Sequence, residues 1–280
     1  MATWSMANPE IPGEIFDHYS LINEEERLAR GDGPLEEART RVLIERQLPA
    51  PPAEVADIGG GAGAYAHWLA AGGYTVHLRD PMPGHIEIAT SASADSATPL
   101  ASVAVGDGRA IDLPDGSVEA VLLLGPLYHL TEPADRIGCL QEARRVLRPG
   151  GVVLAATTRR QTSFPAKVWG NLLADPIFRT IVDRDLAEGQ HRNPTGNSGY
   201  FTTAYFHRPD DLRTELGEAG FSQVDIRAVE GVGWIMPDFD DRWADEESRA
   251  IILEMVALTD SDPDIMGVSP HLLGTGRKTG

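Results

Sequence analysis

The stretch Val55-Ala56-Asp57-Ile58-Gly59-Gly60-Gly61-Ala62-Gly63 decides the fold of this 280-residue chain. Its first four residues are typical of the end of a buried strand. The glycines that follow predict a tight turn in which the backbone can approach a ligand that any Cβ atom would keep away. The alanine-rich segment 62–71 favours a helix, which Gly72-Gly73 ends. The stretch therefore predicts a strand, a glycine loop and a helix that together bind a ligand.

A second strand is expected at Tyr74–Leu78, and Asp80 lies at its end. A carboxylate there can accept hydrogen bonds from both hydroxyls of a ribose, which indicates a nucleoside-containing cofactor. The loop also satisfies the dinucleotide fingerprint in its Gly59-x-Gly61-x-x-Ala64 form. These two segments alone do not separate a nicotinamide-dependent oxidoreductase from an S-adenosylmethionine (SAM) methyltransferase.

The segment from Val103 to Thr158 separates these two classes. It predicts buried strands at Val103–Val105, Val118–Leu124 and Val152–Thr157. With the glycine loop, its motifs resemble the class I SAM-dependent methyltransferases, in particular their small-molecule, type 11-like branch. The matching pieces are Asp57–Gly63, Asp80, Gly106-Asp107 with Leu113–Ser117, Gly125–His129 and Leu147–Gly151. One glycine loop is a weak signal, but five pieces in this order over roughly residues 50–160 are a strong one.

The resemblance implies an α/β, Rossmann-like fold. Its sheet would have seven mostly parallel strands in the order 3-2-1-4-5-7-6, with the last strand antiparallel, helices on both faces and a substrate cap. Residues 1–50 are expected to form a helical arm, and residues 51–280 the SAM-binding domain. Cap insertions are expected at about 159–207 and 230–265, and the final strand at His271–Arg277.

The resemblance also implies roles in cofactor binding. Asp80 would bind the ribose hydroxyls, and Gly59 and Gly61 would lie against the methionine and ribose parts. Asp57 would act mainly through the loop, sometimes through water on the ammonium group. Leu124 would touch the amino-acid end through its main chain.

The adenine ring would be bound by a further group of residues. Pro81 or Met82 would pack against its face, and Asp107 would accept a hydrogen bond from its amino group. The backbone of Gly108 or Arg109 would complete the recognition. Since Gly-Asp-Gly is also common turn sequence, a plain Asx-turn role competes for Asp107.

Outside this core, the N-terminal arm and the first insertion have patterns of their own. Ile15, Tyr19 and Ile22 fall on one helical face, and a short second helix is expected at 23–30. In relatives such an arm folds over the cofactor, so Tyr19 is a candidate contact; a packed anchor is the equal alternative. Residues 159–207 hold seven of the chain's 18 Phe, Tyr and Trp residues, which fits either an aromatic substrate cavity or a small satellite core. The seven are Phe164, Trp169, Phe178, Tyr200, Phe201, Tyr205 and Phe206.

Methyl transfer from SAM is an in-line displacement at an electrophilic methyl group, so aligning the acceptor is the main task of the enzyme. A general base is needed only if the acceptor must lose a proton. His129, which follows the fourth strand, is the first candidate, and His207, which borders the cap, is the second. For His129, a hydrogen-bonded turn histidine is the competing interpretation.

Composition narrows the substrate class. The formal net charge is −18, with 42 acids and 24 bases, whereas a nucleic-acid enzyme needs a basic face. Gly125 also stands where nucleic-acid amino methylases carry an amide or carboxylate. The sequence has a single cysteine, Cys139, no apolar run of membrane-spanning length and no targeting signature. These features predict a cytoplasmic protein that contacts no membrane.

These observations predict a SAM-dependent methyltransferase that methylates oxygen, carbon or nitrogen of a small, largely apolar or aromatic molecule and releases S-adenosylhomocysteine. We expect no metal site, no nucleic-acid partner, and a monomer or homodimer. Two alternatives remain: an NAD(P)-dependent oxidoreductase, and a SAM-binding protein of this fold with non-methylating activity.

Overall fold

The computed structural model describes residues 12–21, 28, 30–163 and 172–280. The N-terminal arm contains α1 (Gly13–Leu21) and α3 (Gly33–Glu45). The short helix expected at 23–30 lies outside the described residues, apart from Leu28 and Arg30.

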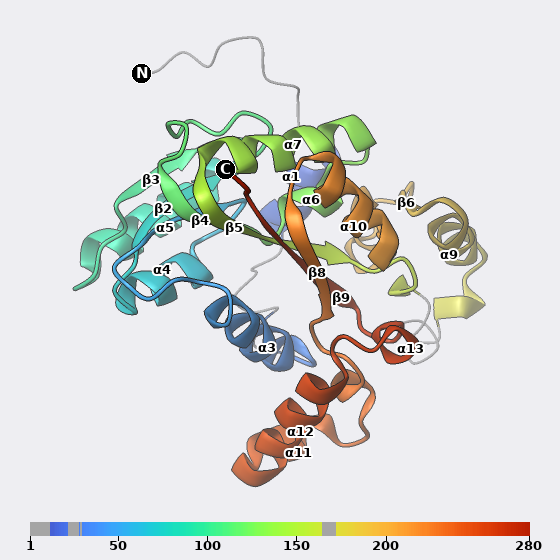
Figure 1. Cartoon of the computed structure of the whole chain (residues 1–280). Helices are drawn as coiled ribbons and strands as arrows, with labels where there is room; N and C mark the ends of the chain where they lie inside the picture. Colours follow the sequence, from blue (N-terminus) through green and yellow to red (C-terminus); the bar gives the residue numbers. More distant parts are fainter. Residues whose placement is uncertain (1–11, 22–27, 29, 164–171) are drawn as a thin grey trace.

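Seven strands form the central sheet, in the order β3-β2-β1-β4-β5-β9-β8 (Figure 1). They are β1 (Glu54–Ile58), β2 (Thr75–Asp80), β3 (Ser102–Val105), β4 (Val118–Leu123), β5 (Leu147–Thr158), β8 (Ser222–Ala228) and β9 (His271–Arg277). β9 pairs antiparallel with both of its neighbours, whereas β1 to β5 pair in parallel. Since β6 (Gln190–His191) and β7 (Ala204–Tyr205) form a separate small sheet, β8 and β9 are the sixth and seventh strands. The predicted order 3-2-1-4-5-7-6 is confirmed.

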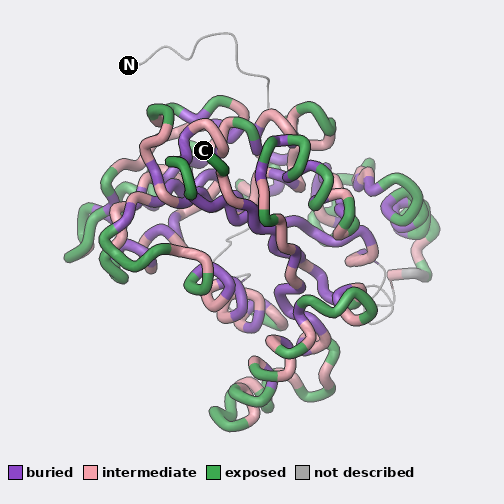
Figure 2. The backbone as a smooth tube through the Cα atoms, viewed as in Figure 1, coloured by how far each residue is buried: buried purple, intermediate pink, exposed green. Residues whose placement is uncertain are grey.

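Helices cover both faces of the sheet, and each face has its own apolar core. The helices are α4 (Ala64–Ala71), α5 (Pro83–Asp95), α7 (Pro133–Val146) and α10 (Pro209–Glu218), with the short α6 (Pro126–His129) after β4. Alternate residues of β4 serve the two cores: Val121 and Leu123 pack with α7 and α10, while Ala120 and Leu122 pack with α3, α4 and α5. This is why the strand reads as a nearly continuous apolar run. Figure 2 shows the buried strands between these more exposed helices.

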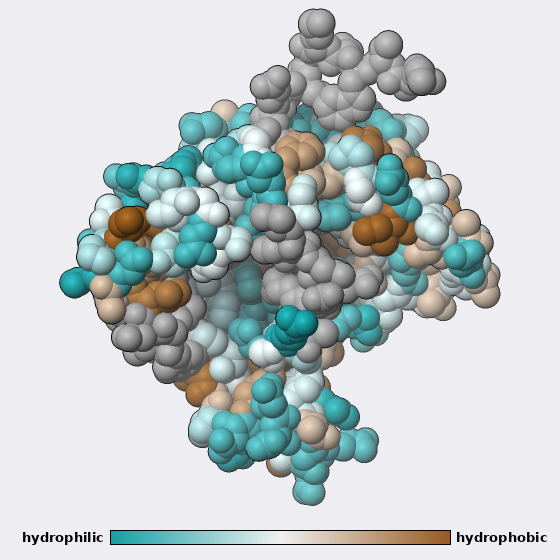
Figure 3. Space-filling view, turned by 180° about the vertical axis from the view of Figure 1, so that it is seen from behind, coloured by the Kyte–Doolittle hydropathy of each residue, from teal (hydrophilic) through white to brown (hydrophobic). Residues whose placement is uncertain are grey.

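Two insertions lie outside the central sheet. The first contains α9 (Pro176–Glu188), β6, β7 and the 3-10 helices η1 (Leu172–Ala174) and η2 (Ser198–Tyr200). The second contains η3 (Gly233–Ile235), α11 (Phe239–Ala244), α12 (Glu246–Thr259) and α13 (Pro263–Met266). α11 and α12 project from the body (Figure 1), and hydrophilic side chains cover much of this projection (Figure 3). Among the described helices, none combines the length and apolar character needed to cross a membrane.

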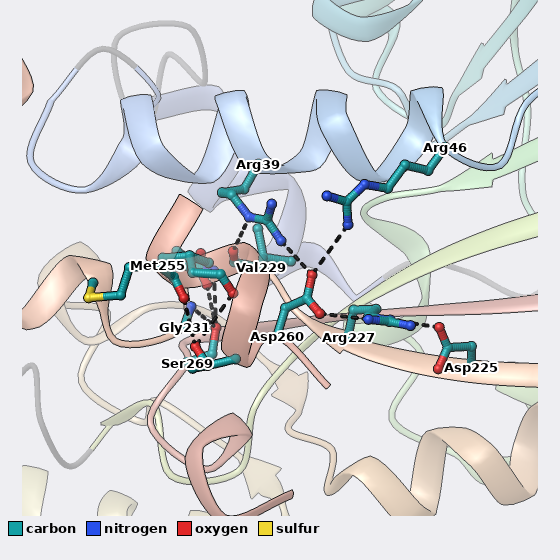
Figure 4. Close-up of polar contacts among 12 residues, drawn as sticks. Arg39, Arg46, Asp225, Arg227, Val229, Gly231, Met255, Asp260 and Ser269 are labelled. Carbon is teal, nitrogen blue, oxygen red and sulfur yellow. Dashed lines mark hydrogen bonds and ion pairs between the residues drawn. The ribbon is translucent and has the colours of Figure 1, made fainter. Parts of the chain in front are cut away.

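A buried carboxylate joins the arm to the second insertion and the sheet (Figure 4). Asp260, just after α12, accepts a hydrogen bond of 2.7 Å from Nη2 of Arg39 on α3 and another of 2.7 Å from Nη1 of Arg227 on β8. Nη1 of Arg46 lies 3.6 Å from the same carboxylate. Because Arg39 and Asp260 are both fully buried, this pair fixes α3 against the sheet.

Candidate active site

A cavity of about 610 Å³ lies at the carboxyl ends of β1, β2 and β4. This is the point at which the strand order reverses, where open α/β sheets bind ligands. The cavity is lined by the glycine loop, the strand-end aspartates, α1, the turn after β4 and the cap. The predicted cofactor residues all line it: Tyr19, Asp57, Gly59, Gly61, Asp80, Pro81, Met82, Asp107, Gly108 and Leu124.

Gly59 and Gly60 of the glycine loop leave no room for side chains. Gly59 and Gly61 have φ angles of 71° and 59°, a region that favours glycine. A Cβ atom on Gly59 would lie 2.6 Å from Cγ of Pro126, and one on Gly60 would lie 2.5 Å from Oδ2 of Asp57. The loop therefore exposes bare backbone to the cavity, as a closely fitting ligand requires.

Asp57 is fully buried, and neither of its carboxylate oxygens has a hydrogen-bond partner among the described residues. Burial, assisted by the nearby charge of Asp80, raises the pKa of Asp57 to about 7. A buried acceptor without a donor is costly to keep. A ligand that brings a positive charge or a hydrogen-bond donor would satisfy it.

Asp80 is nearly buried, and three donors hold its carboxylate. The backbone N–H of Gly61 donates to Oδ2 (2.8 Å), and that of Met82 donates to Oδ1 (2.9 Å). Nδ1 of His85 lies 3.0 Å from Oδ1 and must be the donor, because a carboxylate oxygen only accepts. This arrangement fixes Asp80 at the cavity wall, where a ribose would lie. The contact between His85 and Asp80 was not predicted, although His85 lies in the first turn of α5, directly after Asp80.

Asp107 forms the Asx turn that was the competing interpretation: Oδ1 accepts from the backbone N–H of Arg109 at 2.8 Å. The same carboxylate also pairs with the Arg109 side chain, whose Nη2 lies 2.6 Å from Oδ2. Both residues line the cavity, so the Asx turn does not exclude the predicted binding role. Because the backbone N–H of Arg109 is engaged, that of Gly108 is the better candidate for contacting adenine.

Tyr19, His129 and Thr203 bring α1, the turn after β4 and the cap together. Nε2 of His129 lies 2.7 Å from the Tyr19 hydroxyl, and Nδ1 lies 3.4 Å from the Thr203 carbonyl oxygen. A carbonyl only accepts, so Nδ1 carries the proton and Nε2 accepts from Tyr19. Burial lowers the pKa of His129 to about 4, so the ring is neutral near pH 7. The candidate base, His129, and the candidate contact residue of the arm, Tyr19, are therefore hydrogen-bond partners.

The second base candidate, His207, is wrong. Its ring is fully buried, its Nε2 lies 3.2 Å from Oε2 of Glu215, and it does not line the cavity. Residue 207 continues the edge of β5 through a bridge with Arg159, and its ring lies beside α10. His191 does line the cavity, but its two nitrogens are engaged by Asp185 (3.0 Å) and the Tyr200 carbonyl (2.7 Å).

The cap supports both interpretations of its aromatic residues. Phe178 and Tyr200 pack with Ile181 and Val182 in a small satellite core. Tyr200, Phe201 and Phe206 also line the cavity. Phe164 and Trp169 lie outside the described residues. The second insertion contributes no residue of 230–265 to the cavity among the described residues, so its part in the cap remains a prediction.

These residues fit SAM better than a dinucleotide. The bare glycine loop and the unpartnered carboxylate of Asp57 suit a ligand that carries an ammonium and a sulfonium group. A pyrophosphate at this loop would face two carboxylates, Asp57 and Asp80, whose charges already act on each other.

Comparisons with known proteins agree with this geometry. Residues 56–155 match the family model described as a methyltransferase domain. A ubiquinone/menaquinone biosynthesis C-methyltransferase from Acidiphilium cryptum (strain JF-5) is 31% identical over 227 residues, which cover 78% of this chain and 85% of that protein.

Two solved structures share the fold. A SAM-dependent methyltransferase from Thermotoga maritima, described as a possible histamine N-methyltransferase, has a TM-score of 0.56 at 16% identity; the match covers 95% of this chain and all of that one. The [4+2]-cyclase SpnF also has a TM-score of 0.56, at 17% identity, with 87% of this chain and 81% of that chain covered. At such identities the likeness concerns the fold alone.

Proposed function

Because the chain belongs to the class I SAM-dependent methyltransferases, we propose that it methylates a small, largely apolar or aromatic molecule held between the glycine loop and the cap. The oxidoreductase alternative is not retained. The observation that carries the proposal is the hydrogen bond between Tyr19 and His129, which lies in the same cavity as Asp80 and below the cap.

The cofactor half of the proposal assigns one task to each strand-end aspartate. When bound, SAM supplies an electrophilic methyl group on a sulfonium centre. Asp80, fixed by its three donors, would accept hydrogen bonds from the ribose hydroxyls. Asp57 would face the positively charged methionine end, and Asp107 the adenine amino group. The glycine loop, which has no side chains, would exclude water by close contact.

The part of the cavity that would hold the methyl acceptor is lined by aromatic and imidazole rings. His18 lies edge-on to Phe201 at 5.1 Å between ring centroids, and Phe201 lies 6.0 Å from His129. All three line the cavity, with Ile15 and Phe206 beside them. Flat apolar walls of this kind suit an aromatic or apolar acceptor and restrict how it can lie, which is the main requirement for in-line transfer.

The Tyr19–His129 pair favours an acceptor whose proton must leave. The Tyr19 hydroxyl donates to the unprotonated Nε2 of His129, so it can take a proton from the acceptor while it passes its own to the imidazole. A phenol, or a ring carbon activated by one, needs this transfer. That choice also agrees with the Acidiphilium cryptum relative, which is described as a C-methyltransferase.

Three further proposals concern the setting of the enzyme. The formal net charge of −18 supports a small-molecule substrate over a nucleic acid. The single, buried Cys139 supports a reducing, cytoplasmic compartment. We propose a monomer or homodimer that works without a metal ion.

Turnover with a panel of acceptors tests the function. Purified protein is incubated with SAM and with hydroquinones, phenols, primary amines and short oligonucleotides, each in a separate reaction. We expect S-adenosylhomocysteine and a methylated product with members of the first two groups only. The Asp80→Ala variant, assayed beside it, controls for contaminating enzymes.

Three results would contradict the proposal. Methylation of oligonucleotides would overturn the substrate class, and methylation of amines alone would overturn the proton-transfer role. Conversion of an acceptor without S-adenosylhomocysteine would instead support a non-methylating reaction, the kind of activity named for the structural neighbour SpnF.

A further inference from the structure

One arginine, Arg109, lines the cavity, and the roles assigned above to the strand-end aspartates do not account for its presence there. Arg109 follows β3 by four residues, and its side chain is only 10% exposed. It lines the cavity beside Asp107, Gly108 and Asp135, at the end where adenine would lie. A buried guanidinium is costly unless carboxylates compensate its charge, so its partners indicate what it does there.

Arg109 holds the Asp107 carboxylate at both oxygens. Its Nε lies 3.0 Å from Oδ1, and its Nη2 lies 2.6 Å from Oδ2. Two parallel hydrogen bonds from a planar fork fix the plane of a carboxylate as well as its position. Oδ1 also accepts from the backbone N–H of Arg109, so Oδ2 is the oxygen that keeps acceptor capacity for a ligand.

A second carboxylate, that of Asp135 on α7, also contacts the guanidinium group of Arg109. Oδ2 of Asp135 lies 3.5 Å from Nη1 of Arg109. Burial lowers the pKa of Arg109, but its hydrogen bond to Asp107 and the charges of both carboxylates more than compensate, and the pKa lies above its usual value. The guanidinium therefore stays charged and joins the turn after β3 to the first turn of α7.

We propose that Arg109 is a positioning residue for purine recognition: it fixes the position and plane of the Asp107 carboxylate, so that the site accepts a 6-amino purine and rejects a 6-oxo purine. The inference rests on the proposed function for the place of the adenine. An ionised carboxylate accepts a hydrogen bond from an amino group and repels a carbonyl oxygen.

The burial of Asp107 explains why the arginine is needed. The residue is only 8% exposed, so its carboxylate depends on donors of the protein to hold it in place. Without Arg109, the backbone N–H at position 109 would still bind Oδ1, but Oδ2 would lose its partner.

Calorimetry with two ligands tests the proposal. Wild-type protein should bind S-adenosylhomocysteine at least about tenfold more tightly than S-inosylhomocysteine, the 6-oxo analogue, because one charge-assisted hydrogen bond distinguishes them. Arg109→Met should bring this ratio close to one. A merely structural role would weaken both ligands alike and leave the ratio unchanged.

Arg145→Met is the matched control. Arg145 also pairs with two carboxylates, Glu142 and Asp115, but it lies outside the cavity, so its loss should leave the ratio at the wild-type value. A folded Arg109→Met protein that keeps the wild-type ratio would overturn the proposal. If circular dichroism shows that this variant does not fold, Arg109→Gln is measured instead. A wild-type ratio in folded Arg109→Gln would likewise overturn the proposal. Equal binding of both ligands by the wild type would instead contradict the placement of the adenine.

Discussion

Three aspartates lie at or just after the carboxyl ends of the neighbouring strands β1, β2 and β3, and each carboxylate has a different set of partners. Asp80 accepts from three donors, Asp107 pairs with Arg109, and Asp57 has no partner among the described residues. Their positions could be predicted because apolar runs mark where strands end, and parallel strands end at one edge of a sheet. Their partners could not, because side-chain contacts depend on rotamers that only the folded packing selects.

Asp80 should dominate ribose binding. Asp80→Ala is expected to leave the fold intact and to weaken S-adenosylhomocysteine binding by about 1.5–3 kcal/mol for each hydrogen bond lost. Isothermal calorimetry measures this change. His85→Ala, which removes one of the three donors to Asp80, should cost less. An unchanged affinity in folded Asp80→Ala would mean that the ribose lies elsewhere.

Asp57 should make SAM binding depend on pH. With its pKa raised to about 7 by burial and by Asp80, the carboxyl group is neutral below that pH and ionised above it. Only the ionised form attracts a cationic ligand, so affinity should rise between pH 6 and pH 8. Asp57→Asn should flatten the profile. A profile that falls with pH in the wild type would contradict this role.

Tyr19 and His129 should affect turnover more than binding. Tyr19→Phe keeps the ring but removes the proton, and it should lower kcat by about 10²-fold or more. S-adenosylhomocysteine affinity should change little. Because the pKa of His129 is lowered to about 4, kcat should not fall through loss of the neutral imidazole between pH 8 and pH 6. Near-normal turnover in both Tyr19→Phe and His129→Ala would show that alignment alone carries the reaction.

The secondary-structure elements that carry His129 and His207 explain why only His129 of the two lines the cavity. His129 ends the short α6 directly after β4, at the carboxyl edge of the sheet. His207 also lies close to the cap in the sequence, which is why it was a candidate. Its backbone, however, pairs with the end of β5 and its ring packs against Glu215 of α10. The direction of a side chain at such a bridge cannot be predicted from spacing alone.

Another element differs from its prediction. β5 begins at Leu147, whereas the sequence indicates a strand from Val152. Its pairing with β4 shifts between Val118 and Ala120, so Leu147 pairs before the shift and Val152 after it. The intervening Arg-Pro-Gly-Gly sequence is typical of a turn, and such an irregularity is invisible without the partner strand.

The Asp260 carboxylate should matter for stability. Asp260→Asn leaves the buried Arg39 without its counter-charge and should lower the free energy of unfolding by at least about 2 kcal/mol. Urea denaturation measures the change. Since this pair anchors α3, which lines the cavity with Glu36 and Thr40, ligand binding should weaken as well.

Asp225→Asn is the control for this prediction. Asp225 also pairs with Arg227, but its side chain is 42% exposed, and the change should stay within about 0.5 kcal/mol. Equal stability losses in the two variants would contradict the special role of the buried carboxylate.

At the scale of the whole molecule, the sheet order and the place of the cavity could be predicted because they follow from the order of motifs along the chain. The projection of α11 and α12 could not, since no cofactor motif extends into that region. The acceptor is also harder to predict than the cofactor. The cofactor contacts come from strand ends, whereas the acceptor walls come from α1, the turn after β4 and a long insertion that meet only in the folded chain.

A crystal structure of the protein with S-adenosylhomocysteine tests whether this cavity is the site of methyl transfer. We expect the ribose on Asp80, the adenine beside Asp107 and Arg109, and the sulfur facing Tyr19 and His129 across a closed pocket lined by Phe201. A ligand bound outside this cavity would contradict that assignment. So would a sulfur that faces an open, shallow groove rimmed by arginines, because such a groove would fit a macromolecular acceptor.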